Sequence, residues 1–208
     1  MRRIKNLILL QYETVFALKK YMLLITAVAI FMAIIQPDML PFAGALFIMA
    51  TCYNTAFYEE KSKINYLIYS LPIKEKEYIL SKYIFVAINT FISMGISAVI
   101  YMGMMYFNLI DKETMVPLWA FMLMLLGIGI FMMSILTPLE ILLGFEKARI
   151  ALVFLTVLPV VFSTNIVSLL PKINISNSIF KVLIALCVIT LILASYFITS
   201  NIYLKKDI

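Results

Sequence analysis

Long uncharged runs dominate the pattern of hydrophobic and polar positions along this chain. A helix of roughly 20 apolar residues crosses the hydrocarbon core of a bilayer, which is about 30 Å thick. Six runs have this character, although the first is short and relies on Lys19 and Lys20 reaching outward from its end. We therefore predict an all-α polytopic membrane protein with one transmembrane domain over residues 1–208. The predicted spans are residues 21–35, 39–58, 83–109, 115–143, 150–170 and 179–203.

The first twenty residues follow a different pattern from the spans. Apolar residues such as Leu7 and Phe16 are interleaved with charged ones such as Arg3 and Glu13. A helix of this kind can lie flat in the headgroup region, with its cations toward the phosphates. We predict an interfacial amphipathic helix over residues 1–20, and the alternative is an extended start of the first span. A cleavable signal peptide is not expected, because the segment has no small-residue cleavage site.

The 17 Lys and Arg residues fall mostly on one side of the predicted spans. Cytoplasmic loops of membrane proteins are enriched in these residues, so we predict that both termini are cytoplasmic and that the protein lies in the cell membrane. The net charge of +6 then indicates orientation and attraction to anionic headgroups, not nucleic-acid binding. The predicted cytoplasmic residues are Arg2, Arg3, Lys5, Lys19, Lys20, Lys61, Lys63, Lys74, Lys76, Lys82, Lys147, Arg149, Lys205 and Lys206, against Lys112, Lys172 and Lys181 on the other side.

Composition argues against a soluble domain and against catalysis by this chain. Hydrophobic residues make up 64% of the sequence and charged residues 13%, with a mean hydropathy of +1.04. No His is present, which excludes Ser-His-Asp triads and His-based metal sites. Glu59 and Glu60 suggest an intramembrane protease, but that chemistry needs further His or Asn ligands. No GxxxxGK[ST] loop occurs, so we expect no cofactor here and ATP binding only in another subunit.

One predicted cytoplasmic segment, between the second and third spans, has an amphipathic pattern. Ile64, Leu67, Ile68 and Leu71 recur at helical spacing and form one apolar face. Pro72 should end that short helix, and the run from Lys74 to Glu77 should begin the helix of the third span. An isolated helix of this kind buries its apolar face against lipid or against a partner. The pattern alone leaves both alternatives open.

Two groups of residues resemble permeases of the type 2 ABC transporter superfamily. The first group runs from Glu59-Glu60-Lys61 through Ser70-Leu71-Pro72-Ile73-Lys74 to Glu77 and Lys82-Tyr83, and it is similar to the segment between spans two and three of those permeases. The second is Pro138 followed by Gly144-Phe145-Glu146-Lys147-Ala148-Arg149, which is similar to their connection between spans four and five. The resemblance covers the whole chain in length, span count and topology.

The resemblance implies an ATP-driven transport subunit without ATPase motifs of its own. Two permease subunits would enclose a translocation pathway, as a homodimer or heterodimer, and a cytoplasmic ATPase subunit would supply ATP and Mg²⁺. Most relatives export their cargo. The short helix would dock in a groove of the ATPase, with Glu140 and its neighbours forming a second cytoplasmic region. The implied site residues are Ile64, Leu67, Ile68, Ser70, Leu71 and Pro72 for ATPase coupling, and Pro138, Glu140, Gly144, Glu146, Lys147 and Arg149 for the span-four region.

Residues inside the spans suggest further structural roles. Pro138 removes the hydrogen bond to the carbonyl of Ser134 and should kink span four. Gly127 and Gly129 should permit close helix approach, and Asn54 and Thr55 are expected to bond to a neighbouring helix. Glu140 is expected to pair with a nearby cation. The 14 Met and 15 Phe would suit a hydrophobic or amphipathic cargo, a peptide or lipid, although such residues also fill helix contacts or face lipid.

The main alternative is a six-span substrate-binding component of an energy-coupling vitamin importer. The four-residue spacing of Ala29 and Ala33 would suit its small-residue helix contact, but this spacing is common in membrane helices. The alternative also leaves the apolar face of residues 64–71 unexplained.

The distribution of basic residues predicts the orientation of the chain. In a background without Cys52 and Cys187, Lys112→Cys and Lys172→Cys should react with a membrane-impermeant maleimide added to intact cells. Lys76→Cys and Lys206→Cys should react only after the membrane is permeabilised, because the positive-inside rule places them in the cytoplasm. The reverse labelling pattern would contradict the predicted topology.

Overall fold

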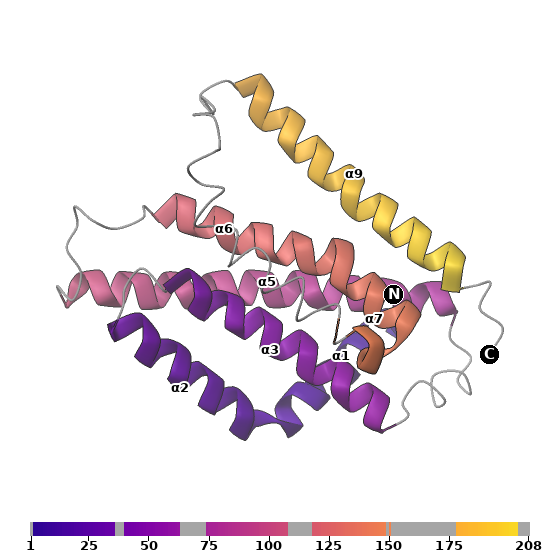
Figure 1. Cartoon of the computed structure of the whole chain (residues 1–208), viewed down its shortest axis with the longest axis horizontal. Coiled ribbons are helices and arrows are strands. Elements are labelled where there is room, and N and C mark those ends of the chain that lie inside the picture. The colour runs from indigo at the N-terminus through magenta and orange to yellow at the C-terminus, as the bar shows by residue number, and fades with distance from the viewer. Residues whose placement is uncertain are drawn as a thin grey trace. The chain divides into compact units, whose positions relative to one another are not determined.

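The computed structural model describes residues 2–35, 40–62, 74–107, 118–148, 150 and 178–203, and every regular element in these ranges is a helix (Figure 1). The predicted all-α class is therefore confirmed for this part of the chain. Two compact units divide the sequence, residues 1–133 and 134–208. The elements are α1 (Arg2–Ala17), α2 (Lys19–Ile35), α3 (Leu40–Lys61), α5 (Glu75–Tyr106), α6 (Leu118–Phe131), the π-helical turn η2 (Met132–Leu136), α7 (Thr137–Leu143) and α9 (Ser178–Tyr203).

Three helical stretches in the described ranges are long and apolar enough to cross a membrane. They are Glu75–Tyr106, Phe121–Leu143 and Leu186–Tyr203, and a fourth is added if Arg3–Ala17 and Lys19–Met32 count as one broken span. The chain is thus a multi-span membrane protein by length and composition. Six spans remain a prediction, since the fifth, residues 150–170, lies outside the described residues except for Ile150.

Helix α1 changes direction sharply before α2 begins. The two helical stretches make an angle of 72° at Leu18, so α1 is not a straight continuation of α2. Instead α1 contacts α5, where the ring of Tyr12 meets Phe85 edge-on at a centroid distance of 5.1 Å. The Tyr12 hydroxyl donates a long hydrogen bond of 3.5 Å to Asn89 Oδ1. An interfacial position for α1 stays a prediction.

Helix α5 is the central element of the first unit and begins where the sequence predicts. It contacts α1, α3 and α6. Lys74 has an extended backbone before the first turn, and its N–H lies 3.4 Å from the Glu77 carboxylate. Glu75 and Glu77 also place negative charge at the positive end of the helix dipole. The predicted start of the third span's helix near Lys74 is confirmed.

The packing between α5 and α6 combines aromatic stacking with one close approach of the two backbones. Tyr101 stacks on Phe121 with ring centroids 6.1 Å apart. At Gly129 of α6, a Cβ atom would fall within 3.0 Å of the Thr90 side chain. At Gly127 no atom of the described residues lies within 4 Å of such an atom. The predicted role in close helix approach is therefore confirmed for Gly129 and wrong for Gly127, because Gly127 faces away from α5.

A second expectation about the spans is also wrong. The Thr55 hydroxyl donates to the carbonyls of Thr51 and Cys52 in its own helix, at 3.0 and 2.8 Å, not to a neighbouring helix. A buried hydroxyl can satisfy its donor within one turn in this way, without needing an interhelical partner.

These two glycines give a matched pair of substitutions in α6. Gly129→Ala should destabilise the protein by about 1 to 3 kcal/mol, because the added methyl group overlaps the buried, branched Thr90 side chain. Gly127→Ala should leave stability unchanged or raise it slightly, since Ala favours helix and meets nothing. Melting temperatures of both purified variants in the same detergent measure the difference. Equal melting temperatures would show that the two helices do not approach closely at Gly129.

Candidate functional site

A buried ion pair joins the last turn of α3 to the second turn of α5. Lys82 Nζ lies 2.6 Å from Glu59 Oε2, and the side chains of Lys82 and Glu59 are 5% and 6% exposed. The Tyr78 hydroxyl donates to the same carboxylate oxygen at 3.1 Å. Lys82 Nζ also lies 5.9 Å from the centre of the Tyr78 ring, within the range of a cation–π contact. Two donors on α5 thus converge on one oxygen of α3.

Helical spacing explains why these three side chains meet. Tyr78 and Lys82 are four residues apart and lie on the same face of α5. Both charges are removed from water, so deleting one partner leaves the other buried and uncompensated, at a cost of about 3 to 5 kcal/mol. Replacing both partners by apolar groups of similar size is often neutral, because the desolvation of two charges offsets their attraction.

Sequence reasoning did not find this pair. Glu59 and Lys82 were named from the sequence only as part of a segment that resembles a known family. Glu59 was considered together with Glu60, as two neighbouring carboxylates. In the structure the two glutamates differ, since Glu59 is buried against α5 and Glu60 is half-buried. The available signal was a Glu that closes one apolar run and a Lys that opens the next, because the adjoining ends of successive helices can meet.

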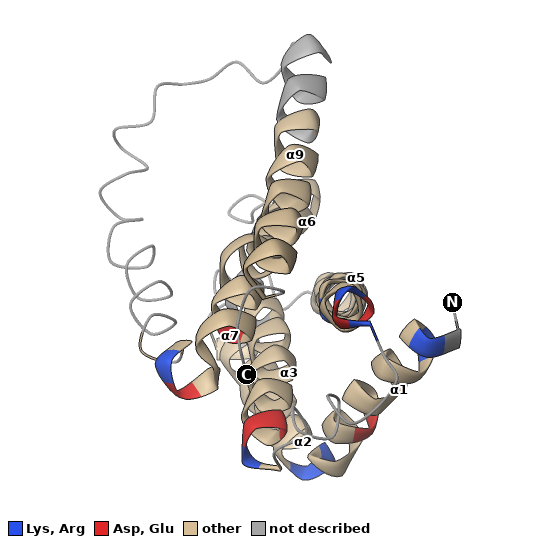
Figure 2. Cartoon of the chain, turned by 90° about the vertical axis from the view of Figure 1, so that its right-hand side faces the viewer, with Lys and Arg blue, Asp and Glu red and all other residues tan. Residues whose placement is uncertain are grey.

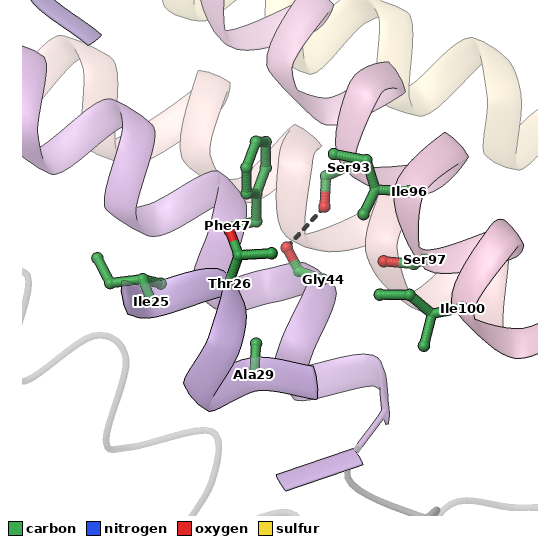
Figure 3. Close-up of a pocket in the computed structure, with 9 residues that line it drawn as sticks. All are labelled: Ile25, Thr26, Ala29, Gly44, Phe47, Ser93, Ile96, Ser97 and Ile100. Carbon is green, nitrogen blue, oxygen red and sulfur yellow. Dashed lines mark hydrogen bonds between the residues drawn. The ribbon is translucent and has the colours of Figure 1, made fainter. Parts of the chain in front are cut away.

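A second contact joins α3 and α5 at a different level. Buried Asn89, Ser93 and Ser97 recur every four residues along α5, none of them more than 2% exposed. Ser93 Oγ donates to the carbonyl of Gly44 at 2.7 Å, and a Cβ atom on Gly44 would lie 2.6 Å from Ser97 Oγ (Figure 3). Small residues therefore let the two backbones approach, as is typical of helix contacts in membranes.

A small hollow lies beside this contact, between α2, α3 and α5 (Figure 3). Its empty volume is about 310 Å³, a figure that includes the open space at its mouth. The Thr26 hydroxyl at its edge already donates to the carbonyl of Met22 at 2.8 Å. The hollow is too small to hold a peptide or lipid cargo.

Charged residues of the first unit occupy a limited part of its described helices. Figure 2 shows them on α1, at the start of α2, at the end of α3 and at the start of α5, whereas the long remainders of α2, α3 and α5 carry none. The ends of α3 and α5 that carry charge are those joined by Glu59 and Lys82. Among the described residues, no group of three or more Asp, Glu, Cys or His could hold a metal ion.

A π-helical turn interrupts the α-helix just before Pro138, whereas the predicted kink of span four stays a prediction. The π-helical turn η2 ends two residues before Pro138, which lies in the first turn of α7. Pro138 has no N–H to bond the Ser134 carbonyl, and the Ser195 hydroxyl of α9 donates to that carbonyl at 2.9 Å. Thr199, one turn further along α9, donates to the Ser195 carbonyl at 2.7 Å. The Ser195 side chain thus supplies the hydrogen-bond donor that Pro138 lacks.

The predicted glycine-plus-charge connection follows α7 directly. Gly144 has a φ of 78°, a left-handed backbone that strains other residues, and its N–H bonds the Glu140 carbonyl at 3.0 Å. Residues 145–148 are helical, with Phe145 buried and Glu146 and Lys147 exposed. Glu140 is half-buried and has an interaction partner, although its expected pairing with a cation stays a prediction. Arg149 lies outside the described residues.

Comparison with known protein families identifies the chain. The family described as ABC-2 family transporter protein matches residues 4–204, which is nearly the whole sequence. The chain belongs to the ABC-2 transporter family. The resemblance based on the Ser-Leu-Pro segment and the Gly144 connection is thereby confirmed. No curated protein and no solved structure gives a significant match.

For this ABC-2 family member, the structure places some of the implied site residues and not others. The six residues of the predicted ATPase-coupling helix lie outside the described residues, whereas Ser62 and Lys74, on either side of the segment, are described. In the span-four region, the structure places Pro138 and Glu140 on α7, Gly144 directly after it, and Glu146 and Lys147 in the helical residues 145–148. The six coupling residues are Ile64, Leu67, Ile68, Ser70, Leu71 and Pro72.

The contact at Ser134 predicts non-additive effects on stability. Ser195→Ala should destabilise this ABC-2 protein by about 0.6 to 1.7 kcal/mol, because the carbonyl loses the Ser195 donor. The loss should shrink in a Pro138→Ala background, where the new N–H can bond Ser134. Thermal melting of the two single variants and the double variant measures this coupling. Thr190→Ala, on an exposed face of α9, is the control, and strictly additive effects would contradict the assignment.

Proposed function

We propose that this chain is the transmembrane permease subunit of an ATP-driven ABC exporter. The observation that carries the proposal is the ABC-2 family match over residues 4–204. Two copies, or this chain and a related permease, form the translocation pathway. A separate cytoplasmic ATPase subunit binds ATP and Mg²⁺ and supplies the energy. This chain has no catalytic role.

The proposed route from the ATPase to the membrane runs through residues 63–73. They connect the charged ends of α3 and α5, which the positive-inside rule assigns to the cytoplasm. The apolar face of Ile64, Leu67, Ile68 and Leu71 then docks in a groove of the ATPase. The coupling residues Ser70 and Pro72 end the docking helix. Both termini of the permease are cytoplasmic in this arrangement.

The proposed cargo is hydrophobic or amphipathic, a peptide or a lipid-like molecule. The apolar composition of the spans, with 14 Met and 15 Phe, supports this class of cargo. The hollow between α2, α3 and α5 is too small for it. We therefore assign the pathway to the contact between two permease subunits.

The vitamin-importer alternative is not favoured by any feature of the site. Buried Ala29 lines the hollow against α3 and α5, so this small residue serves packing within the chain. Nanomolar vitamin binding by the isolated chain would be the result that revives the alternative.

The docking helix provides the sharpest experiment on the proposed function. Leu67→Asp should abolish co-purification of the ATPase, because it places a charge in a face that is buried in the complex. A fully buried Leu side chain contributes about 1.5 to 3 kcal/mol, so affinity should fall at least tenfold. Affinity pull-down of the wild type and the variant at matched expression measures the change.

Asn65→Asp is the matched control for this experiment. It adds the same charge to the same helix with almost no change in size, but outside the apolar face. ATPase recovery should stay near the wild-type level with Asn65→Asp. A helix that rests only on lipid predicts equal recovery for wild type and Leu67→Asp in detergent, and that outcome would remove the coupling role from this segment.

A further inference from the structure

The buried pair of Glu59 and Lys82 lies close to both points where residues 63–73 join the described helices. Ser62 follows Glu59 by three residues, and Lys74 precedes Lys82 by two helical turns. Both Ser62 and Lys74 are exposed, whereas the pair between them is almost completely buried. The spacing of these two attachment points therefore depends on how the ends of α3 and α5 are held.

The ion pair of Glu59 and Lys82 fixes the relative orientation of α3 and α5 as well as the separation of their ends. Lys82 Nζ and the Tyr78 hydroxyl reach the same oxygen of Glu59, at 2.6 and 3.1 Å. Hydrogen bonds and ion pairs with this convergence allow few relative orientations, because each loses strength when it is bent. Apolar side chains of the same volume would hold the helices together but let them slide. A charged cluster at this place therefore specifies geometry more than it adds stability.

A second level of contact also joins α3 and α5. The hydrogen bond from Ser93 to the Gly44 carbonyl lies near the opposite end of α3. Between the two levels, Ile48 of α3 and Phe85 of α5 are fully buried. A displacement applied at the charged end is thus carried along both helices and is not absorbed by separation of their ends.

We propose that Glu59 and Lys82, aligned by Tyr78, are positioning residues that set the separation and orientation of the ends of α3 and α5. A displacement of residues 63–73 then moves both helices together. The consequence for transport rests on the proposed function, whereas the positioning role concerns this chain alone and is measured without the ATPase.

Spin labels at Ser62→Cys and Lys74→Cys report the separation directly, in a background without Cys52 and Cys187. The double variant Glu59→Gln/Lys82→Met removes both charges of the pair together. Its melting temperature should stay near that of the parent, but the distance distribution between the labels should become roughly twofold wider, because the fully satisfied network that rigidifies this end is lost. Lys82→Arg keeps the charge and should preserve the narrow distribution.

Glu60→Gln/Lys61→Met is the control, since it removes one acidic and one basic side chain from the same turn of α3 without touching the buried pair. Its distance distribution should match the parent. If the first double variant does not fold, Glu59→Asp replaces it, because it keeps both charges but withdraws the carboxylate by one methylene, and it should also widen the distribution. An unchanged distribution in the folded Glu59 variant, or equal widening in the control, overturns the positioning role.

The same variants separate this role from the proposed docking. The ATPase should still co-purify with Glu59→Gln/Lys82→Met, because the apolar face of residues 64–71 is intact. Loss of ATPase with Leu67→Asp but not with the double variant agrees with both proposals. Normal ATPase recovery with Leu67→Asp removes the docking role and leaves the measured distances to decide the positioning role.

Discussion

Polar groups inside a membrane bundle must find their partners within the protein, because hydrocarbon offers none. At several positions the described helices of this chain meet this constraint, in one of three ways, whereas Gln11 Oε1 and Asn89 Nδ2 are buried without a partner among the described residues. Threonine hydroxyls such as Thr51 and Thr55 bond carbonyls of the preceding turn. Serines bridge between helices, from Ser93 to Gly44 and from Ser195 to Ser134. Where charges are buried, they neutralise one another. The positions of the helix contacts follow from these requirements more than from apolar packing, since lipid is as apolar as leucine.

The sequence predicts the general architecture well because the bilayer imposes a simple rule on length and composition. Runs of uncharged residues identified helices over α2, α3, α5, α6 and α9, and the start of α5 followed from Lys74 and Glu77. The family followed from a few residues around Pro72, Pro138 and Gly144, and the match over residues 4–204 confirms it. These features are local in sequence, so a reading along the chain can recognise them.

Contacts between helices were harder to predict, and the errors have a common physical origin. Gly127 and Gly129 are the same residue type in the same helix, so their sequence gives no reason to tell them apart. Because they are two residues apart, Gly129 faces α5 and Gly127 faces away from it. Thr55 was expected to donate to a neighbouring helix, but its hydroxyl donates to a carbonyl of its own helix. The ion pair of Glu59 and Lys82 depends on which faces of α3 and α5 meet, and hydrophobic pattern does not specify a face when a helix is apolar all round.

The π-helical turn at Met132–Leu136 changes which residues share one face of the helix that contains it. A π-turn contains one residue more than an α-turn, so every residue after it is rotated by about 100° from its place on an uninterrupted helix. A helical wheel drawn with one phase through Phe121–Leu143 therefore assigns Pro138 and Glu140 to the wrong face. Relatives that lack the extra residue will align correctly here only with a one-residue gap.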